Sequence, residues 1–131
     1  MKIIGRIEKI EILNFNILVQ SKIDTGAWRN TLHVDDIKEV NGILNVIIGK
    51  SSFDFKKFKS VKVRNSFGEE QLRYAIKLEF KIGENDYKSS FSLTDRSQMK
   101  YQCLLGRKFL SENKFIVDVN KKNINYGIKK S

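Results

Sequence analysis

The chain has 131 residues, of which 40% are hydrophobic and 31% are charged. This length suits one domain with a real core, so we expect residues 1–131 to form a single globular unit. The composition excludes an intrinsically disordered chain, and the absence of a long apolar run excludes a membrane-spanning helix. Lys and Arg outnumber Asp and Glu by 25 to 15 and are densest in a tail at about 121–131. Because basic residues are spread along the whole chain, this favours a solvated basic surface over a dedicated phosphate-binding face.

Alternating apolar residues predict strands along most of the chain. The alternation is clear at residues 17–23, 61–64, 73–82 and 87–93, and apolar runs at 43–49, 101–106 and 115–119 add to it. Turn chemistry at 83–86 and 65–70 predicts two hairpins, the second with Gly68 in a positive-φ position. Residues 107–114 suit one or two helical turns. We therefore expect an all-β fold with one short helix near the C-terminus.

The single cysteine and the single histidine limit the chemistry of the chain. Cys103 excludes an internal disulfide bond. Because the N-terminus also lacks the features of a signal peptide, we expect a cytoplasmic protein. The histidine, His33, stands in no H-E-x-x-H motif, so we expect no metal and no cofactor. We interpret Cys103 as a buried small hydrophobe and His33 as a structural side chain in its loop.

The segment KIDTGAWRNTLH, residues 22–33, holds the one D-T-G of the chain. In most β proteins this triplet is a turn, in which Asp accepts a hydrogen bond from nearby backbone. Two Asp residues that share one proton can instead hold a water, take its proton and protonate a leaving group. Since the chain has one copy, the second carboxylate must come from another chain. A C2 homodimer would place Asp24 of each subunit at the axis.

Four segments in order support the catalytic interpretation: KIDTGAWRNTLH, VRNSFGEEQLRY, SLTDRSQMKYQCLLGRKFL and FIVD. Together they resemble the retropepsin-like aspartic proteases. Within these they are similar to a bacterial branch once labelled ATP-dependent zinc proteases, which is associated with glutamate-adding ATP-grasp ligases. The resemblance covers residues near 5–120. It implies a single-lobe acid-protease barrel with one short C-terminal helix, and aspartic endopeptidase activity. It also implies a protein or peptide substrate, either a glutamylated protein or the ligase itself.

The resemblance also implies a role for each matching residue. Asp24 would be the catalytic carboxylate, Thr25 would brace the two active-site loops, and Gly26 would contact the substrate backbone. Contacts with substrate are implied for Ala27, Trp28, Arg64, Asn65, Ser66, Phe67, Gly68 and Leu105. Structural support is implied for Gly106, Arg107, His33 and Asp95. The hairpin at 64–70 would be a flap that closes over an extended peptide.

Two positions depart from the family pattern. Trp28 stands where the bacterial branch often has a basic residue, and three roles are open for it: a substrate subsite wall, a dimer contact and core packing. Arg107 lacks the Asp that often follows D-T-G-A in the retroviral enzymes. Asp95 and Asp118 are the candidate partners in its place.

Two other functions stay open. A retropepsin-like fold could bind a peptide or partner without cleaving it, since Asp24 would be present in both cases. A basic nucleic-acid module would need aromatic residues interleaved with Lys and Arg on one strand face, and FDFKKFK at 53–59 is the candidate. We interpret this segment as a surface loop with buried phenylalanines, so nucleic acid is not the expected partner. Arg64 and Arg73 are either exposed flap charges or contacts for an acidic peptide.

Overall fold

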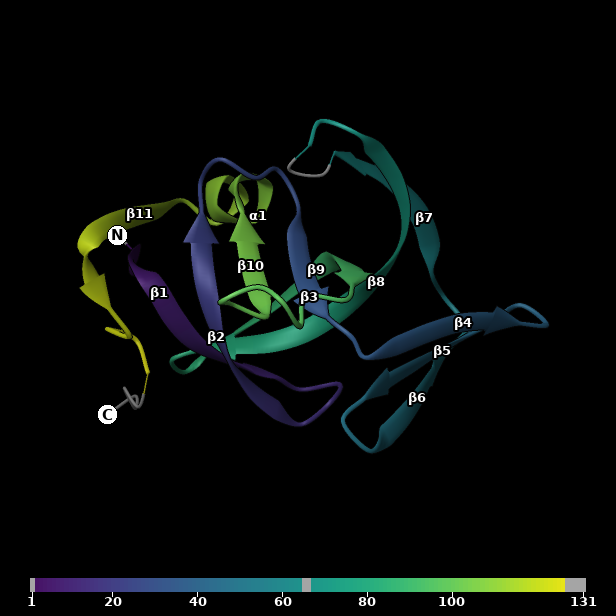
Figure 1. Cartoon of the computed structure of the whole chain (residues 1–131). Helices are drawn as coiled ribbons and strands as arrows, with labels where there is room; N and C mark the ends of the chain where they lie inside the picture. Colours follow the sequence, from purple (N-terminus) through teal and green to yellow (C-terminus); the bar gives the residue numbers. More distant parts are fainter. Residues whose placement is uncertain (1, 65–66, 127–131) are drawn as a thin grey trace.

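The computed structural model describes residues 2–64 and 67–126 (Figure 1). In chain order its elements are β1 (Lys2–Ile12), β2 (Ile17–Asp24), β3 (Asn30–His33), β4 (Asp36–Val40), β5 (Ile43–Ile48), β6 (Ser51–Phe55), β7 (Lys59–Arg64), β8 (Glu70–Ile82), β9 (Asn85–Thr94), β10 (Cys103–Gly106), α1 (Arg107–Glu112) and β11 (Phe115–Lys122). The predicted all-β fold with one short C-terminal helix is confirmed. Within the described residues, no helix has the length and apolar character needed to cross a membrane.

Six strands close into a barrel. The large sheet runs in the order β11-β1-β2-β10-β3-β9-β8-β7, and β1 also pairs with β8. The strands β1, β2, β10, β3, β9 and β8 therefore form a ring, with β11 added beside β1 and β7 added beside β8. A second sheet, in the order β4-β5-β6, lies beside the barrel (Figure 1). This architecture confirms the single-lobe barrel that the resemblance implied.

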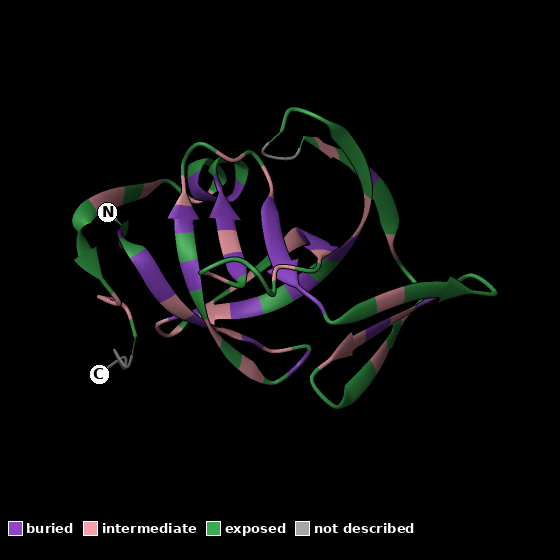
Figure 2. Cartoon of the chain, viewed as in Figure 1, coloured by how far each residue is buried: buried purple, intermediate pink, exposed green. Residues whose placement is uncertain are grey.

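The barrel core follows the predicted alternation. The core face of β8 is buried at Ile76, Leu78, Phe80 and Ile82. Phe80 lies at the centre of an aromatic cluster, with its ring centroid 5.3 Å from that of Phe91 and 5.2 Å from that of Phe109. Phe109 and Leu110 are the buried residues of α1, so this cluster fixes the helix against the barrel. Figure 2 shows burial concentrated on the barrel strands, whereas β7 and the adjoining part of β8 are mostly exposed.

Both predicted hairpins are present. β8 and β9 are joined at Gly83, whose φ is 63°, and the segment between β7 and β8 contains Gly68, whose φ is 81°. Glycine is favoured in this left-handed region because it has no Cβ. Figure 1 shows the β7–β8 hairpin arching toward the loop between β2 and β3. Asn65 and Ser66, which we expected in the flap, lie outside the described residues.

The interpretation of residues 53–59 as a loop is partly wrong. Residues 51–55 form β6, because Phe53 and Phe55 pack on one buried ring. Their ring centroids lie 4.8 and 5.7 Å from that of Phe15, in the turn between β1 and β2. Burial was predicted for the phenylalanines, and Phe53, Phe55 and Phe58 are each half-buried.

Part of the predicted basic tail at about 121–131 stays attached to β1 beyond the end of β11. Asn125 donates from its side chain to the Ile3 carbonyl at 3.0 Å and to the Glu8 carboxylate at 3.1 Å. Glu8 is fully buried and also accepts a hydrogen bond from the Gly5 backbone N–H at 2.8 Å. A buried carboxylate needs such donors, so Glu8 anchors residues that composition alone assigns to a solvated tail.

Candidate active site

Asp24 ends β2 at the rim of the barrel. The parallel register between β2 and β10 places Gly106 directly beside it. The Asp24 side chain is half-buried, and its Oδ1 accepts a hydrogen bond from the Gly26 backbone N–H at 3.1 Å. The Ala27 N–H donates to the Asp24 backbone carbonyl at 3.2 Å. The D-T-G segment is thus a hydrogen-bonded turn, as the simplest interpretation expected, but its carboxylate also faces a cavity.

The D-T-G loop rests on the junction between β10 and α1. A Cβ atom on Gly106 would lie 2.6 Å from the Arg29 carbonyl oxygen and 2.8 Å from the Trp28 carbonyl oxygen. These distances are too short for any side chain, so glycine permits the close approach of the two backbones. The Arg107 N–H then donates to the Ala27 carbonyl at 2.7 Å. These backbone contacts hold the D-T-G loop, and with it Asp24, in place.

Arg107 holds the same loop with its side chain. Its Nη1 donates to the Thr25 carbonyl at 3.0 Å, and its guanidinium lies 5.3 Å from the centroid of the Trp28 ring. The expectation that Asp95 or Asp118 would pair with Arg107 is wrong. Each of these carboxylates instead accepts a hydrogen bond from the backbone N–H two residues further on. A carbonyl and an aromatic face therefore replace the missing family carboxylate.

Two predicted substrate contacts need revision. Trp28 is 52% exposed and lines the cavity, which excludes core packing and leaves the subsite wall and the dimer contact. Leu105 is fully buried among the core residues, so a direct contact with substrate is wrong. Successive residues of a strand face opposite sides, and the neighbouring Leu104 lines the cavity instead.

The cavity over Asp24 has a volume of about 720 Å³. Gly26, Ala27 and Trp28 line it from the D-T-G loop, and Arg64 lines it from the end of β7. Residues that lie far apart in the sequence are thus brought together as the resemblance implied. The predicted flap residues Phe67 and Gly68 are not among its lining residues, and Phe67 is 85% exposed. Thr25 is exposed on the loop and also does not line the cavity.

The cavity is strongly basic. Against two carboxylates, Asp24 and Asp95, it is lined by five cationic side chains: Arg29, Lys62, Arg64, Arg73 and Arg96. Burial lowers the pKa of Arg73, and the nearby charge of Arg96 lowers it further. The Nε of Arg73 is buried without a hydrogen-bond partner. A buried unpaired donor is unfavourable, so an anion at this place would stabilise Arg73.

His33 positions Arg96 in this cavity. Its Nδ1 accepts a hydrogen bond from the Arg96 backbone N–H at 2.8 Å, and its Nε2 lies 2.8 Å from Asp35 Oδ1. Because Nδ1 accepts, Nε2 carries the proton and donates to Asp35. Asp95 approaches the same ring, with Oδ1 3.7 Å from Nδ1. These contacts are of the structural kind that the sequence predicts for His33 and Asp95.

Replacing Asp35 with asparagine should reduce stability in a pH-dependent way. Hydrogen bonds from the Gly49 backbone and from His33 lower the pKa of Asp35 below its ordinary value of 3.8. Such a carboxylate stabilises the fold above pH 3.8, and this contribution is lost as the pH falls through the lowered pKa. Urea unfolding should show Asp35→Asn less stable than wild type at neutral pH, with the difference shrinking below pH 3.8. If Asp35→Asn and wild type differed equally in stability at neutral pH and below pH 3.8, the stabilising role of the Asp35 carboxylate would be contradicted.

The single cysteine is unsuited to act as a nucleophile. In residues 2–64 and 67–126, no group of three or more His, Cys, Asp and Glu side chains could hold a metal ion. Cys103 is fully buried, and burial raises the pKa of its thiol to about 12. The thiolate is the reactive form, so Cys103 is inert at neutral pH. The prediction of a buried small hydrophobe is confirmed.

Sequence reasoning missed Asn30, which is 3% exposed. Its Oδ1 accepts from the Gly106 N–H at 2.9 Å, while its Nδ2 donates to Ser89 Oγ at 2.9 Å and to the Ser90 carbonyl at 3.1 Å. Asn30 therefore ties the end of the D-T-G loop to both β10 and β9. The sequence gives one indication of this role: Asn30 is a polar residue at the start of a short segment between two turns.

Comparisons with known proteins agree with this geometry. The model of the RimB-like family, described as retropepsin-like aspartic endopeptidase RimB, matches residues 49–127. Two curated proteins named "probable alpha-L-glutamate ligase" are each 29% identical to this chain. The one from Shewanella pealeana aligns over 115 residues, 76% of this chain and 24% of its own length. The one from Parasynechococcus marenigrum aligns over 105 residues, 69% of this chain and 22% of its own length.

The chain therefore spans about a quarter of the length of these curated relatives. The fold also has a match among solved structures. The crystal structure of Lpg0085, a protein of unknown function from Legionella pneumophila, has a TM-score of 0.74 and 25% sequence identity. The match covers 95% of this chain and 98% of that chain, so the whole barrel is shared.

Proposed function

Because this chain belongs to the RimB-like family of retropepsin-like aspartic endopeptidases, we propose that it hydrolyses peptide bonds at a dyad of two Asp24 carboxylates, one from each subunit of a C2 homodimer. One observation carries the proposal. Asp24 ends a barrel strand beside Gly106 and faces a cavity that the flap also lines. The expected place of this activity is the cytoplasm, where the free thiol of Cys103 would stay reduced.

A second copy of the chain is needed because one carboxylate cannot do the chemistry. Among the described residues, the other carboxylate that lines the cavity belongs to Asp95. It accepts a hydrogen bond from the Ser97 N–H and lies beside His33, so it is already engaged. Exposed apolar side chains lie on the same loop and flap, Trp28 and Leu72 among them. A partner subunit or a bound peptide would cover them.

In the proposed dyad, the two carboxylates share one proton because two like charges at close range cannot both ionise. The ionised Asp24 takes a proton from a water held between the two carboxylates, and the water oxygen attacks the peptide carbonyl carbon. The protonated partner then gives its proton to the amide nitrogen as the carbon–nitrogen bond breaks. The flap excludes bulk water and pairs with the extended peptide.

The charge of the cavity supports an acidic peptide as substrate. Arg64, Arg73 and Arg96 surround the place where substrate side chains would lie next to Asp24. Guanidinium groups match carboxylates with paired hydrogen bonds, which favours Glu and Asp side chains. The curated relatives are named as glutamate ligases and contain a matching segment within a much longer chain. We therefore propose a glutamylated protein, or such a ligase itself, as substrate or partner.

Replacing Arg73 with glutamine should raise KM for acidic peptides by about 10- to 100-fold, because a guanidinium–carboxylate contact of this kind contributes about 1.5–3 kcal/mol. For neutral peptides, KM should change little. Steady-state kinetics on a matched pair of peptides, with Glu or Gln at each position beside the cleaved bond, checks this. Arg6, which lies on β1 and does not line the cavity, provides the control as Arg6→Gln. Equal effects on the two peptides would contradict a role of Arg73 in specificity.

The proposed function is tested by incubating the protein with a pool of denatured peptides between pH 3 and 8. Mass spectrometry of the products would give the cut sites. We expect cleavage with acidic residues enriched around the cut sites. A dimeric protein that cleaves nothing in this range would favour a domain that binds peptide without hydrolysing it.

A further inference from the structure

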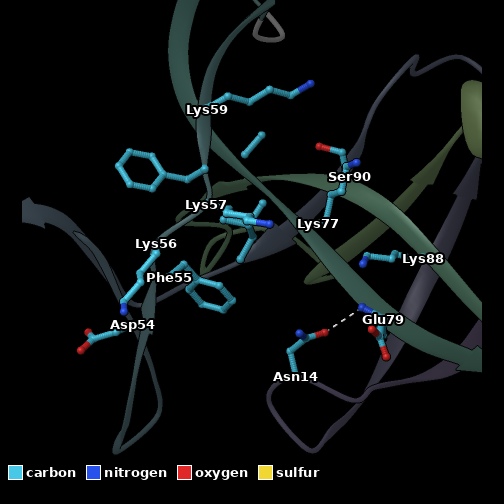
Figure 3. Close-up of a pocket in the computed structure, with 13 residues that line it drawn as sticks. Asn14, Asp54, Phe55, Lys56, Lys57, Lys59, Lys77, Glu79, Lys88 and Ser90 are labelled. Carbon is cyan, nitrogen blue, oxygen red and sulfur yellow. Dashed lines mark hydrogen bonds between the residues drawn. The ribbon is translucent and has the colours of Figure 1, made fainter. Parts of the chain in front are cut away.

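A second cavity of about 730 Å³ lies apart from the candidate active site and shares no lining residue with it. Five lysines line it: Lys56, Lys57, Lys59, Lys77 and Lys88. We name this cavity the lysine groove. Figure 3 shows Asp54, Phe55 and Lys56 on one side of the groove and Lys77, Glu79 and Lys88 on the other. The first side consists of the end of β6 and the residue that follows it, and the second belongs to β8 and β9.

The lysine groove carries more positive than negative charge. All five lysines are exposed, and in the described residues none lies within ion-pair distance of a carboxylate. Two carboxylates, Asp54 and Glu79, also line the groove. Asp54 already accepts a hydrogen bond from Asn45 Nδ2 at 2.8 Å. The groove therefore presents five ammonium groups and a clear excess of positive charge to a ligand.

The lysine groove includes the end of an edge strand, since Asp54 and Phe55 of β6 line it. β6 is the last strand in the order β4-β5-β6, and within the described part of the chain it pairs with β5 alone. An edge strand presents a row of unpaired backbone N–H and C=O groups, to which an extended peptide can add as a further strand. Phe55 and Phe58 line the same groove and are half-buried, so they add apolar surface beneath such a peptide.

We propose that the lysine groove binds an extended acidic segment of a polypeptide, which pairs with the open edge of β6 and places its carboxylates against the lysines. The single strands of a nucleic acid would match the charge, but they have no backbone that pairs with a strand edge. The open edge therefore favours a peptide. This binding does not depend on the proposed hydrolysis, because the groove contains none of the residues around Asp24.

The test uses Asp24→Asn protein, so that no bound peptide is cleaved, and a fluorescent peptide of alternating Glu and Val. Fluorescence anisotropy measures its Kd. We expect the additional pair Lys77→Gln and Lys88→Gln to weaken binding by about tenfold, since two exposed ion pairs with the peptide are lost. The matched control pair is Lys38→Gln and Lys121→Gln, which removes the same charge from exposed lysines outside both cavities. Equal weakening by the two pairs would overturn the site.

Two further measurements decide where and how the peptide binds. Amide chemical shifts should change at residues 51–59 and 77–90, whereas changes confined to 24–29 and 62–73 would place the peptide in the candidate active site and overturn the inference. A peptide with N-methyl groups on alternate residues should bind much more weakly, because it cannot pair with β6. Tighter binding of a uridine oligonucleotide, lost with the same two lysines, would show a nucleic-acid site and also overturn the proposal.

Discussion

Peptide cleavage should fall by about 10³-fold when Asp24 is replaced with asparagine. The proposed dyad needs one ionised and one protonated carboxylate, and an amide supplies neither a base nor an acid near neutral pH. General acid–base catalysis by a positioned group contributes about 10²–10⁴-fold, and this change removes both roles in a homodimer. The rate constant for cleavage of a defined acidic peptide, measured with excess enzyme, checks the prediction.

The fold should tolerate the Asp24→Asn change. Oδ1 accepts one hydrogen bond, from the Gly26 N–H, and asparagine keeps that oxygen. The free energy of unfolding should therefore change by less than about 1 kcal/mol. Asp95→Asn provides a matched control, since Asp95 also lines the cavity but accepts from the Ser97 N–H. Cleavage that survives in Asp24→Asn, or that is lost equally in both variants, would contradict the assignment of the dyad.

Gly106→Ala should reduce both stability and activity. The added Cβ would lie 2.6 Å from the Arg29 carbonyl oxygen and 2.8 Å from the Trp28 carbonyl oxygen. Both are backbone atoms, so the backbone of the D-T-G loop must move. Overpacking of this kind costs about 1–3 kcal/mol of unfolding free energy. A displacement of about 1 Å at the catalytic group would lower the cleavage rate by about 10²-fold. Urea unfolding and peptide kinetics on the same preparation check the two effects.

Gly42→Ala separates the effect of the loop from a general effect of replacing glycine. Gly42 has φ 77° with open space around the position of a Cβ, and it lies in the turn between β4 and β5. Alanine in this left-handed conformation costs about 1–2 kcal/mol. We expect Gly42→Ala to lose stability and keep its cleavage rate. If Gly106→Ala also kept its rate, the close contact beneath the loop would have no role in positioning Asp24.

The parts of the fold that were predictable are those with one buried and one exposed face. In β8, Leu78 and Phe80 are buried while Lys77 and Glu79 are exposed, so the period of two is visible in the sequence. β3 is buried at all four positions and β4 is mostly exposed. Neither strand alternates, because the surroundings of each are set by distant segments. Pairing of β3 with β9 and β10 is a property of the topology that no local pattern contains.

The candidate site was predictable where a motif is local. The D-T-G turn and the β7–β8 hairpin each lie in one segment, and residues of both line one cavity. The contacts of Arg107 with Thr25 and Trp28, and those of Asn30 with β9, cross from one segment to another. Such contacts depend on the closure of the barrel. The lysine groove has the same origin, since its lysines come from three separate strands and a loop.

In the proposed mechanism, catalysis needs two copies of Asp24, one from each subunit. Specific cleavage activity, measured over a range of protein concentration in which sedimentation reports the fractions of monomer and dimer, tests it most directly. We predict that specific activity rises in proportion to the dimer fraction and approaches zero in the monomer. A monomeric protein that cleaves peptides with constant specific activity would contradict the shared dyad.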